Sequence, residues 1–199
     1  SAHPSTAEIF LPNGRPPKQG EMFYQTDLAA TLAKVAEVED SHKSNGRVAA
    51  LKATRDYIYT GELGRKIAAF NQETGGLLTE EDLAAYHVQV LPPVSVNYRG
   101  YDVYSTGPWG QGPTFPQALK ILEGFDLASM GHNSAEYIHT VSQALNLAFA
   151  DREQYVADPD FVDVPINELL SGEYLAHRRG LIDPDLAWPG MPPAGDPRN

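Results

Sequence analysis

The chain has 199 residues, enough for one full-sized hydrophobic core or for one part of a larger one. Hydrophobic residues make up 42% of it and aromatic residues 10%, which is typical of a folded chain and excludes a disordered one. The formal net charge of −11 argues against nucleic-acid binding and against docking on anionic membranes, because both need a basic surface. The absence of cysteine excludes disulfides, thiolate metal sites and a cysteine nucleophile.

The first twenty residues are rich in proline and glycine, so we expect them to form an extended segment. A helix is predicted over residues 25–38, where Thr26 or Asp27 can cap it and apolar residues recur at helical spacing. The helical pattern of residues 48–70 contains internal glycines, which predicts two helices or one helix kinked near Gly61. No apolar run reaches the length needed to span a membrane.

A short helix is predicted to end at Tyr86, because Thr79 can act as an N-cap and acidic residues follow it. Residues 88–97 favour a bent or edge strand interrupted by two prolines, and residues 101–104 should pair with it through a turn. The remaining predicted helices cover residues 114–124, 134–156, 164–170 and 173–179. From residue 184 the chain is dense in proline and is expected to be an exposed tail or linker.

A loop over residues 107–116 separates the second strand from the next helix and contains three glycines and three prolines. Such a loop is stiff and irregular, and its glycines allow the backbone to approach another group closely. Most loops only connect elements, and that is the simpler interpretation here. The alternative is a loop that lines a pocket, in which case Trp109 and Gln111 are the candidate substrate-binding residues.

Other catalytic and metal-binding patterns are missing from the sequence. The six histidines are scattered, so no metal site is expected. Ser1 is rejected as an N-terminal nucleophile, because the proline-rich segment behind it cannot form the buried strand that this chemistry requires. Four aspartates near Arg152 do not have the spacing of a calcium loop, so Asp–Arg pairing or turn capping is the simpler interpretation. They are Asp151, Asp158, Asp160 and Asp163.

Several long stretches follow one another along the chain, and they carry a resemblance. They are GGLLTEEDLAAY (75–86), YRGY with the loop after it (98–113), QALKILEGFDL (117–127), AFADREQYVADPDFVDVP (148–165) and LLSGEYLAHRRGLID (169–183). Together they resemble the γ-glutamyltranspeptidase family of N-terminal-nucleophile hydrolases, over roughly residues 14–183. The resemblance is specific, because several motifs recur in order.

The resemblance implies an α/β, helix-rich fold that forms part of an αββα sandwich. Residues 1–199 are then a single piece from the C-terminal part of a large subunit. It has an extended segment at 1–20, a helix-rich body at 21–183 with a strand pair near 88–104, and a linker at 184–199 before a processing site. The family cuts its precursor at a threonine, which becomes the nucleophile of a small subunit. This chain is therefore expected to contain no catalytic residue and to need no cofactor.

The resemblance implies two partners, the small subunit with its N-terminal threonine and a small γ-glutamyl substrate such as glutathione. It also implies a periplasmic or extracellular location, with a cytoplasmic one left open. The loop sequence GPWGQGP departs from the Pro/Ser-rich version common in glutathione-cleaving members. A related amide acylase, similar to the cephalosporin acylases, therefore stays an alternative. A helical scaffold domain without catalytic activity is a third.

Overall fold

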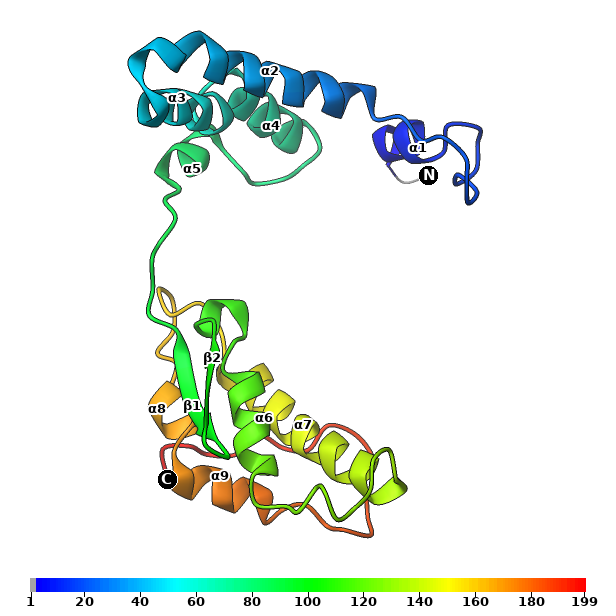
Figure 1. Ribbon diagram of the computed structural model, residues 1–199, viewed down its shortest axis with the longest axis vertical. Coiled ribbons are helices and arrows are strands. Elements are labelled where there is room, and N and C mark those ends of the chain that lie inside the picture. The colour runs from blue at the N-terminus through cyan, green and yellow to red at the C-terminus, as the bar shows by residue number, and fades with distance from the viewer. Residues whose placement is uncertain (1–2) are drawn as a thin grey trace. The chain divides into compact units, whose positions relative to one another are not determined.

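The computed structural model describes residues 3–199 and divides into two compact units, one ending at Val88 and the other running from Gln89 to Asn199 (Figure 1). Ser1 lies outside the described residues. The first unit is helical. Its elements are α1 (Pro4–Phe10), α2 (Thr26–His42), the 3-10 turn η1 (Lys43–Asn45), α3 (Arg47–Tyr59), α4 (Glu62–Glu73) and α5 (Glu80–Ala85).

Most boundaries of the first unit follow the sequence prediction. The break between α3 and α4 falls at Thr60 and Gly61, which confirms two helices. Thr79 caps α5 as expected: its side chain accepts a hydrogen bond from the Asp82 main-chain N–H at 3.1 Å, and the Asp82 carboxylate accepts one from the Thr79 N–H at 2.9 Å. The expected side-chain cap of α2 is wrong, because its N-cap residue is Gln25 and makes no such bond.

The prediction that residues 1–20 are extended is wrong for their first half, since α1 occupies residues 4–10. Proline fits this helix because Pro4 is its first residue, where a missing N–H costs nothing and a φ near −65° suits a helix. Residues 11–20 contain turns and irregular backbone but no helix or strand. Pro4 therefore marks the first turn of a short helix and not an extended segment.

The first unit has little interior of its own. Helix α3 packs against α2 and α4, and α5 packs against α3 and α4. Among its described residues the buried ones are small: Ala50, Gly64 and Ala68. Large apolar side chains expected on the buried faces are instead exposed, including Leu28 at 48% and Leu32 at 59%. The helices of the unit therefore cover one another's apolar faces only incompletely.

The second unit begins with a β-hairpin. Strands β1 (Val94–Tyr98) and β2 (Tyr101–Ser105) are antiparallel, with Tyr98 opposite Tyr101, as the sequence predicted. The turn residues Arg99 and Gly100 both have positive φ, at 50° and 89°, as hairpins with two-residue loops favour. The predicted strand start at residue 88 is wrong, because β1 begins only after the two prolines, which cannot donate ladder hydrogen bonds.

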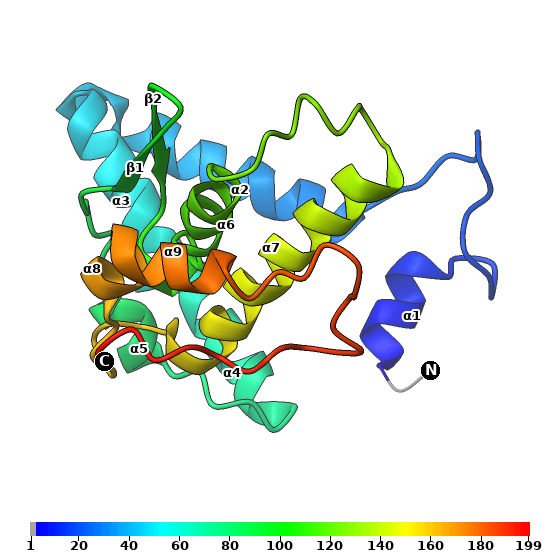
Figure 2. The same ribbon diagram turned by 90° about the horizontal axis from the view of Figure 1, so that it is seen from below.

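The remaining elements of the second unit are the short turn η2 (Pro108–Gly110) and four helices. These are α6 (Thr114–Leu122), α7 (Ala135–Tyr155), α8 (Ile166–Leu169) and α9 (Gly172–Arg179). Helix α6 packs against α7, α9 and both strands, as Figures 1 and 2 show. The core is built at this contact from five buried side chains: Ile121, Leu122, Ala144, Leu147 and Leu175.

The C-terminal segment is largely exposed, as its proline content suggested, but part of it is bound to the helices. Pro192 and Pro197 are buried, and the segment, red in Figure 2, runs back along α7. The main-chain N–H of Trp188 donates to Gln143 Oε1 at 3.3 Å, and that of Gly195 donates to Asp151 Oδ1 at 2.9 Å. An extended proline-rich chain keeps free carbonyls, and side chains of α7 and α9 bind them.

Candidate functional site

The loop between β2 and α6 closes tightly on itself. The main-chain N–H groups of Gly110 and Gly112 both donate to the carbonyl oxygen of Gly107, at 3.1 and 3.3 Å. Gly112 also passes so close to Thr106 that a Cβ there would lie 1.8 Å from the Thr106 carbonyl oxygen. Only glycine fits such an approach. The short segment therefore presents its side chains from a fixed backbone, as the sequence indicated.

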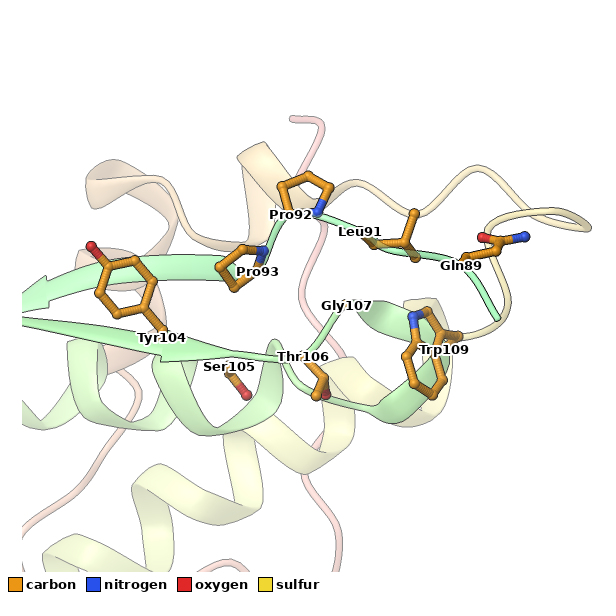
Figure 3. Close-up of a pocket in the computed structure, with 9 residues that line it drawn as sticks. All are labelled: Gln89, Leu91, Pro92, Pro93, Tyr104, Ser105, Thr106, Gly107 and Trp109. Atoms are coloured by element: carbon orange, nitrogen blue, oxygen red, sulfur yellow. The ribbon is translucent and has the colours of Figure 1, made fainter. Parts of the chain in front are cut away.

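This loop forms one wall of an open pocket of about 390 Å³ (Figure 3). The opposite wall is the segment that leads into β1, and Figure 3 shows Tyr104 toward one end of the pocket and Trp109 toward the other. None of the side chains that line the pocket is charged. They are Gln89, Leu91, Pro92, Pro93, Tyr104, Ser105, Thr106 and Trp109, together with Gly107.

The two candidate residues of the loop take different places. Trp109 lines the pocket and is 59% exposed, so its ring is accessible to a ligand. Gln111 is absent from the pocket lining, and its Oε1 accepts a hydrogen bond from Arg152 Nη1 at 3.0 Å. The Arg152 guanidinium also lies 4.4 Å from the centroid of the Phe149 ring, a cation–π contact. Gln111 therefore ties the loop to α7, while Trp109 faces the open space.

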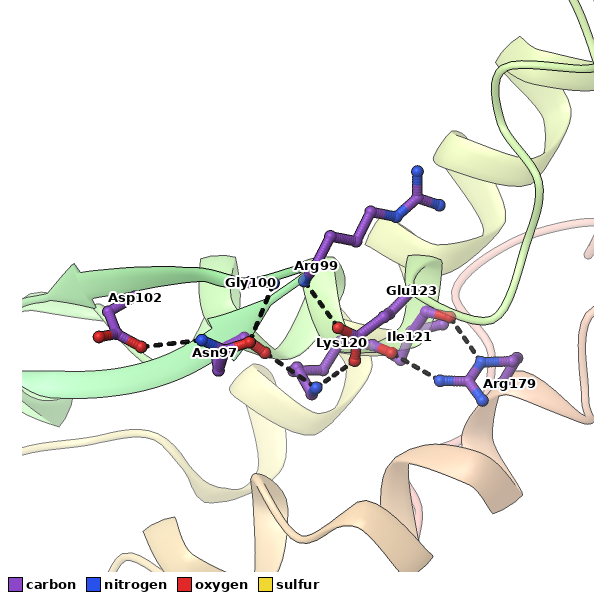
Figure 4. A network of polar contacts seen from close by, with 8 residues as sticks. All are labelled: Asn97, Arg99, Gly100, Asp102, Lys120, Ile121, Glu123 and Arg179. Atoms are coloured by element: carbon purple, nitrogen blue, oxygen red, sulfur yellow. Dashed lines mark hydrogen bonds and ion pairs between the residues drawn. The ribbon is translucent and has the colours of Figure 1, made fainter.

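A polar network joins the hairpin turn to the C-terminal end of α6 (Figure 4). The Glu123 carboxylate accepts a hydrogen bond from the Arg99 main-chain N–H at 2.8 Å and pairs with Lys120. These two contacts, the main-chain hydrogen bond first, lower the pKa of Glu123 below its ordinary value. Lys120 Nζ also donates to the Asn97 carbonyl oxygen at 2.9 Å, so β1 is joined to α6.

Helix α9 completes the support by capping α6. Arg179 donates from Nε to the Ile121 carbonyl at 2.8 Å and from Nη2 to the Lys120 carbonyl at 2.7 Å. Carbonyls in the last turn of a helix have no partner within the helix, so this guanidinium satisfies two of them. The helix that follows the pocket loop is thus fixed at its C-terminal end.

The aspartates near Arg152 do not converge on one point. Asp151 is fully buried and pairs with Arg178 at 2.9 Å, whereas Arg152 pairs with Glu153. Asp158 Oδ1 accepts from the Asp160 main-chain N–H at 2.9 Å, which is turn capping, and Asp163 pairs with Arg198 at 2.5 Å. Asp–Arg pairing holds for Asp151 and Asp163, and turn capping holds for Asp158.

Arg178 is the residue that sequence reasoning missed. It is 1% exposed and lies on the same face of α9 as Tyr174 and Leu175, which are also buried. The spacing of three and four residues from these apolar positions was the available signal. Burial, followed by the nearby charge of Asp151, raises the pKa of Tyr174 well above its ordinary value, so this phenol stays neutral.

Within residues 3–199, no group of three or more histidine and carboxylate side chains is placed to hold a metal ion. None of the described helices is both long enough and apolar enough to cross a membrane.

Comparison with known proteins gives consistent matches along the chain. Residues 1–195 match the family model of γ-glutamyltranspeptidase. The chain is 38% identical to the glutathione hydrolase proenzyme of Escherichia coli (strain K12), covering 94% of this chain and 30% of that protein. It is 36% identical to the acylase ACY 1 proenzyme of Pseudomonas sp. (strain SE83), covering 92% of this chain and 30% of that protein. The chain therefore spans less than a third of the length of these relatives.

Solved structures agree with the sequence matches. The γ-glutamyltranspeptidase of Helicobacter pylori superimposes with a TM-score of 0.77 at 30% identity, over 96% of this chain and 52% of that one. The cephalosporin acylase of Bacillus halodurans gives 0.73 at 34% identity, over 89% of this chain and 30% of that one. The helix-rich fold is thus shared with these enzymes. The chain belongs to the γ-glutamyltranspeptidase family, and it matches the large-subunit region of that family.

Proposed function

We propose that the chain is the C-terminal part of the large subunit of an enzyme that transfers or hydrolyses the γ-glutamyl group of glutathione or related amides. The observation that carries this is the match of residues 1–195 to the family, since it runs through both units and not through one motif alone. Because the chain spans only part of its relatives, the activity belongs to the complete protein.

In the proposed reaction a threonine hydroxyl, which lies outside this chain, attacks the γ-carbonyl carbon of the substrate. The amide C–N bond breaks, the amine leaves with a proton, and an ester of the threonine remains. Water or a second amine then attacks the ester, which releases glutamate or a new γ-glutamyl amide and restores the hydroxyl. Hydrogen-bond donors around the carbonyl oxygen stabilise the charge that forms there.

This chain contributes structure and a pocket wall to that enzyme. Its helices form an outer layer of an αββα sandwich whose main sheets are completed by the rest of the protein. In the pocket, Trp109 contacts the substrate with its exposed ring. Gln111 supports this contact by holding the loop against Arg152.

The pocket lining favours an amide acylase as the second candidate. Glutathione carries two carboxylates and an ammonium group, and none of the side chains that line this pocket is charged. An uncharged acyl or amine group fits an aromatic and proline-rich wall better, because burying an unpaired charge is costly. The similarity to the acylase proenzyme of Pseudomonas points the same way.

The deciding experiment uses the full-length precursor. Intact mass and N-terminal sequencing are expected to show a small fragment that begins with threonine, and the processed enzyme is expected to release product from a chromogenic γ-glutamyl anilide. If the processed enzyme cleaves no γ-glutamyl amide but removes the acyl side chain of a cephalosporin, the acylase is correct. A single uncut chain that is inactive on both substrates identifies the non-catalytic scaffold.

A further inference from the structure

Asp151 connects three segments of the second unit that are far apart in the sequence. Its Oδ2 accepts a hydrogen bond from Gln117 Nε2 on α6 at 2.5 Å, and its Oδ1 lies 2.9 Å from Arg178 Nη2 on α9. Oδ1 also accepts from the Gly195 main-chain N–H at 2.9 Å. Asp151, Arg178 and Gln117 are at most 1% exposed, so this cluster is shielded from water.

The partners of Arg178 extend the cluster to the C-terminal segment. Arg178 Nη1 and Nη2 both donate to the Pro193 carbonyl oxygen at 3.2 Å, and Nη2 also donates to the Leu147 carbonyl at 3.1 Å. Tyr155 Oη donates to the Gly195 carbonyl at 2.7 Å. We call residues 191–199 the strap. Side chains of α7 and α9 therefore form hydrogen bonds with main-chain groups of two strap residues, Pro193 and Gly195.

The strap passes close to α9 at Gly195. A Cβ at Gly195 would lie 2.3 Å from Tyr174 Oη, so a side chain at this position would push the strap away from α9. Pro192 and Pro197, on either side of the gripped residues, are buried. The strap is thus held by polar contacts at Pro193 and Gly195, which lie between two buried prolines.

A buried ion pair is by itself weak evidence of a stabilising role, because desolvation of the two charges offsets their attraction. Apolar residues would fill the same space without that cost. What apolar residues cannot do is hold the carbonyl of Pro193 and the N–H of Gly195. The function that accounts for the charges is therefore recognition of the strap backbone.

We propose that Asp151 and Arg178 are positioning residues that fix the path of the strap and, with it, the peptide bond that the precursor cuts. This inference rests on the proposed function. Cleavage consumes one water and leaves a carboxylate on the large subunit and a free amine on the threonine. Because that reaction needs the carbonyl and the hydroxyl in close register, a strap released from α7 and α9 slows it. Through Gln117 the same cluster also joins the strap to the helix that follows the pocket loop.

The test uses two designs in the full-length precursor. Asp151→Asn alone leaves a buried unpaired arginine and risks unfolding. The first design therefore replaces the whole cluster with apolar residues, Asp151→Leu, Arg178→Met and Gln117→Met. The strap groups that lose partners can then reach water, and outside the strap the Leu147 carbonyl inside α7 also loses one. The second, Arg178→Lys, keeps the charge but loses the forked geometry that serves Pro193 and Leu147 together. Asp163→Asn is the control, since it breaks the exposed pair with Arg198 on the same strap.

Two readouts are followed at equal folded fraction: the self-cleavage rate, and hydrogen exchange of the peptide that contains Gly195. In the triple apolar variant we expect the Gly195 peptide to exchange at least tenfold faster and the precursor to be cleaved at least tenfold more slowly than in wild type. Arg178→Lys should change both rates in the same directions by a smaller factor. Asp163→Asn should leave both within twofold of wild type. If exchange of the Gly195 peptide is unchanged in the folded apolar variant, Asp151 and Arg178 do not hold the strap in place; we call that holding role the clamp. Fast exchange with wild-type cleavage overturns the positioning role.

The two designs keep the inference separate from the proposed function. If the triple apolar variant does not fold, the exchange and self-cleavage rates of Arg178→Lys, compared with those of wild type, decide the question instead. If the wild-type precursor is never cleaved, the proposed function fails and the positioning role fails with it. The exchange of the Gly195 peptide then still shows whether the clamp exists.

Discussion

At the scale of single residues, the pocket loop separates two tasks that lie two positions apart in the sequence. Trp109 presents an exposed ring to the pocket, and Gln111 turns back to Arg152 on α7. Gln111 has a φ of 60°, in the left-handed region, which redirects the chain between the two side chains. A ligand in the pocket would therefore contact the first residue and depend only indirectly on the second.

The Trp109 role predicts a change in KM. Removing one apolar contact face of the indole ring costs about 1–2 kcal/mol of binding, a factor of roughly 5–30 in affinity. We expect Trp109→Ala to raise the KM of the processed enzyme for its amide by that factor, and Trp109→Phe to raise it less. Phe161→Ala is the matched control, because Phe161 is 85% exposed in the same unit and does not line the pocket. An alanine variant with wild-type KM would remove Trp109 from the substrate site.

Single residues also show what the sequence can predict about a site. Trp109 was singled out because it lies in a stiff loop of glycines and prolines that could line a pocket, and it does line one, while its contact with a substrate stays a prediction. Asp151 belongs to the group of aspartates for which pairing with an arginine was one of two interpretations, and no partner was assigned to it. Its partner lies 27 positions further along, as the bond between Asp151 and Arg178 shows. Only the packing of α7 against α9 brings the two together.

At the scale of elements, most signals that depend on neighbouring residues were reliable, although the expected cap of α2 was not found. The capping box at Thr79, the cap of α7 at Ser134 and the hairpin turn at Arg99 each follow from a few adjacent residues. The strap could not be predicted this way. Its prolines indicate only that it forms no helix, while its fixed path comes from side chains of α7 and α9.

The hairpin and α6 are joined by an electrostatic contact that should depend on pH. The Glu123 carboxylate accepts from the Arg99 N–H, and its pKa is lowered. A lowered pKa means that the charged form stabilises the fold above the ordinary pKa of about 4.5 and that this stability is lost as the pH falls through the folded-state pKa. We expect Glu123→Gln to lower the free energy of unfolding at pH 7, with the difference from wild type shrinking below pH 4.5.

Urea unfolding of the full-length protein at pH 7 and at pH 3.5 measures this difference. Glu168→Gln is the control, because Glu168 is exposed on α8 and its side chain has no ion pair within the described chain. A Glu123→Gln difference that stays the same at both pH values would show that the carboxylate charge does not hold the hairpin on α6.

At the scale of the whole molecule, the exposed area is large for the chain's mass. The chain of 21.7 kDa has an accessible surface of 13567 Å². Surface scaling of folded monomers gives about 11,000 Å² for two independent globules of half this mass. Large apolar side chains are exposed in both units, and those of the first include Leu51 at 46%, Phe70 at 56% and Leu77 at 91%. Sequence periodicity finds these apolar faces but cannot say what covers them.

This exposure predicts the behaviour of the isolated 199-residue chain. Apolar side chains left exposed within each unit should bind an apolar dye and drive self-association. We expect the isolated chain to raise dye fluorescence several-fold over the full-length protein at equal concentration and to elute as oligomers in size-exclusion chromatography. Replacing Leu28 and Leu32 by glutamine, both on α2 and both exposed, should lower the dye signal without unfolding the helices. A monodisperse monomer with no dye-detectable surface would contradict the assignment of this chain as one part of a larger enzyme. That assignment requires the isolated chain to bind dye and the full-length precursor to give no such signal. In the precursor the remainder of the protein covers the apolar faces of this chain.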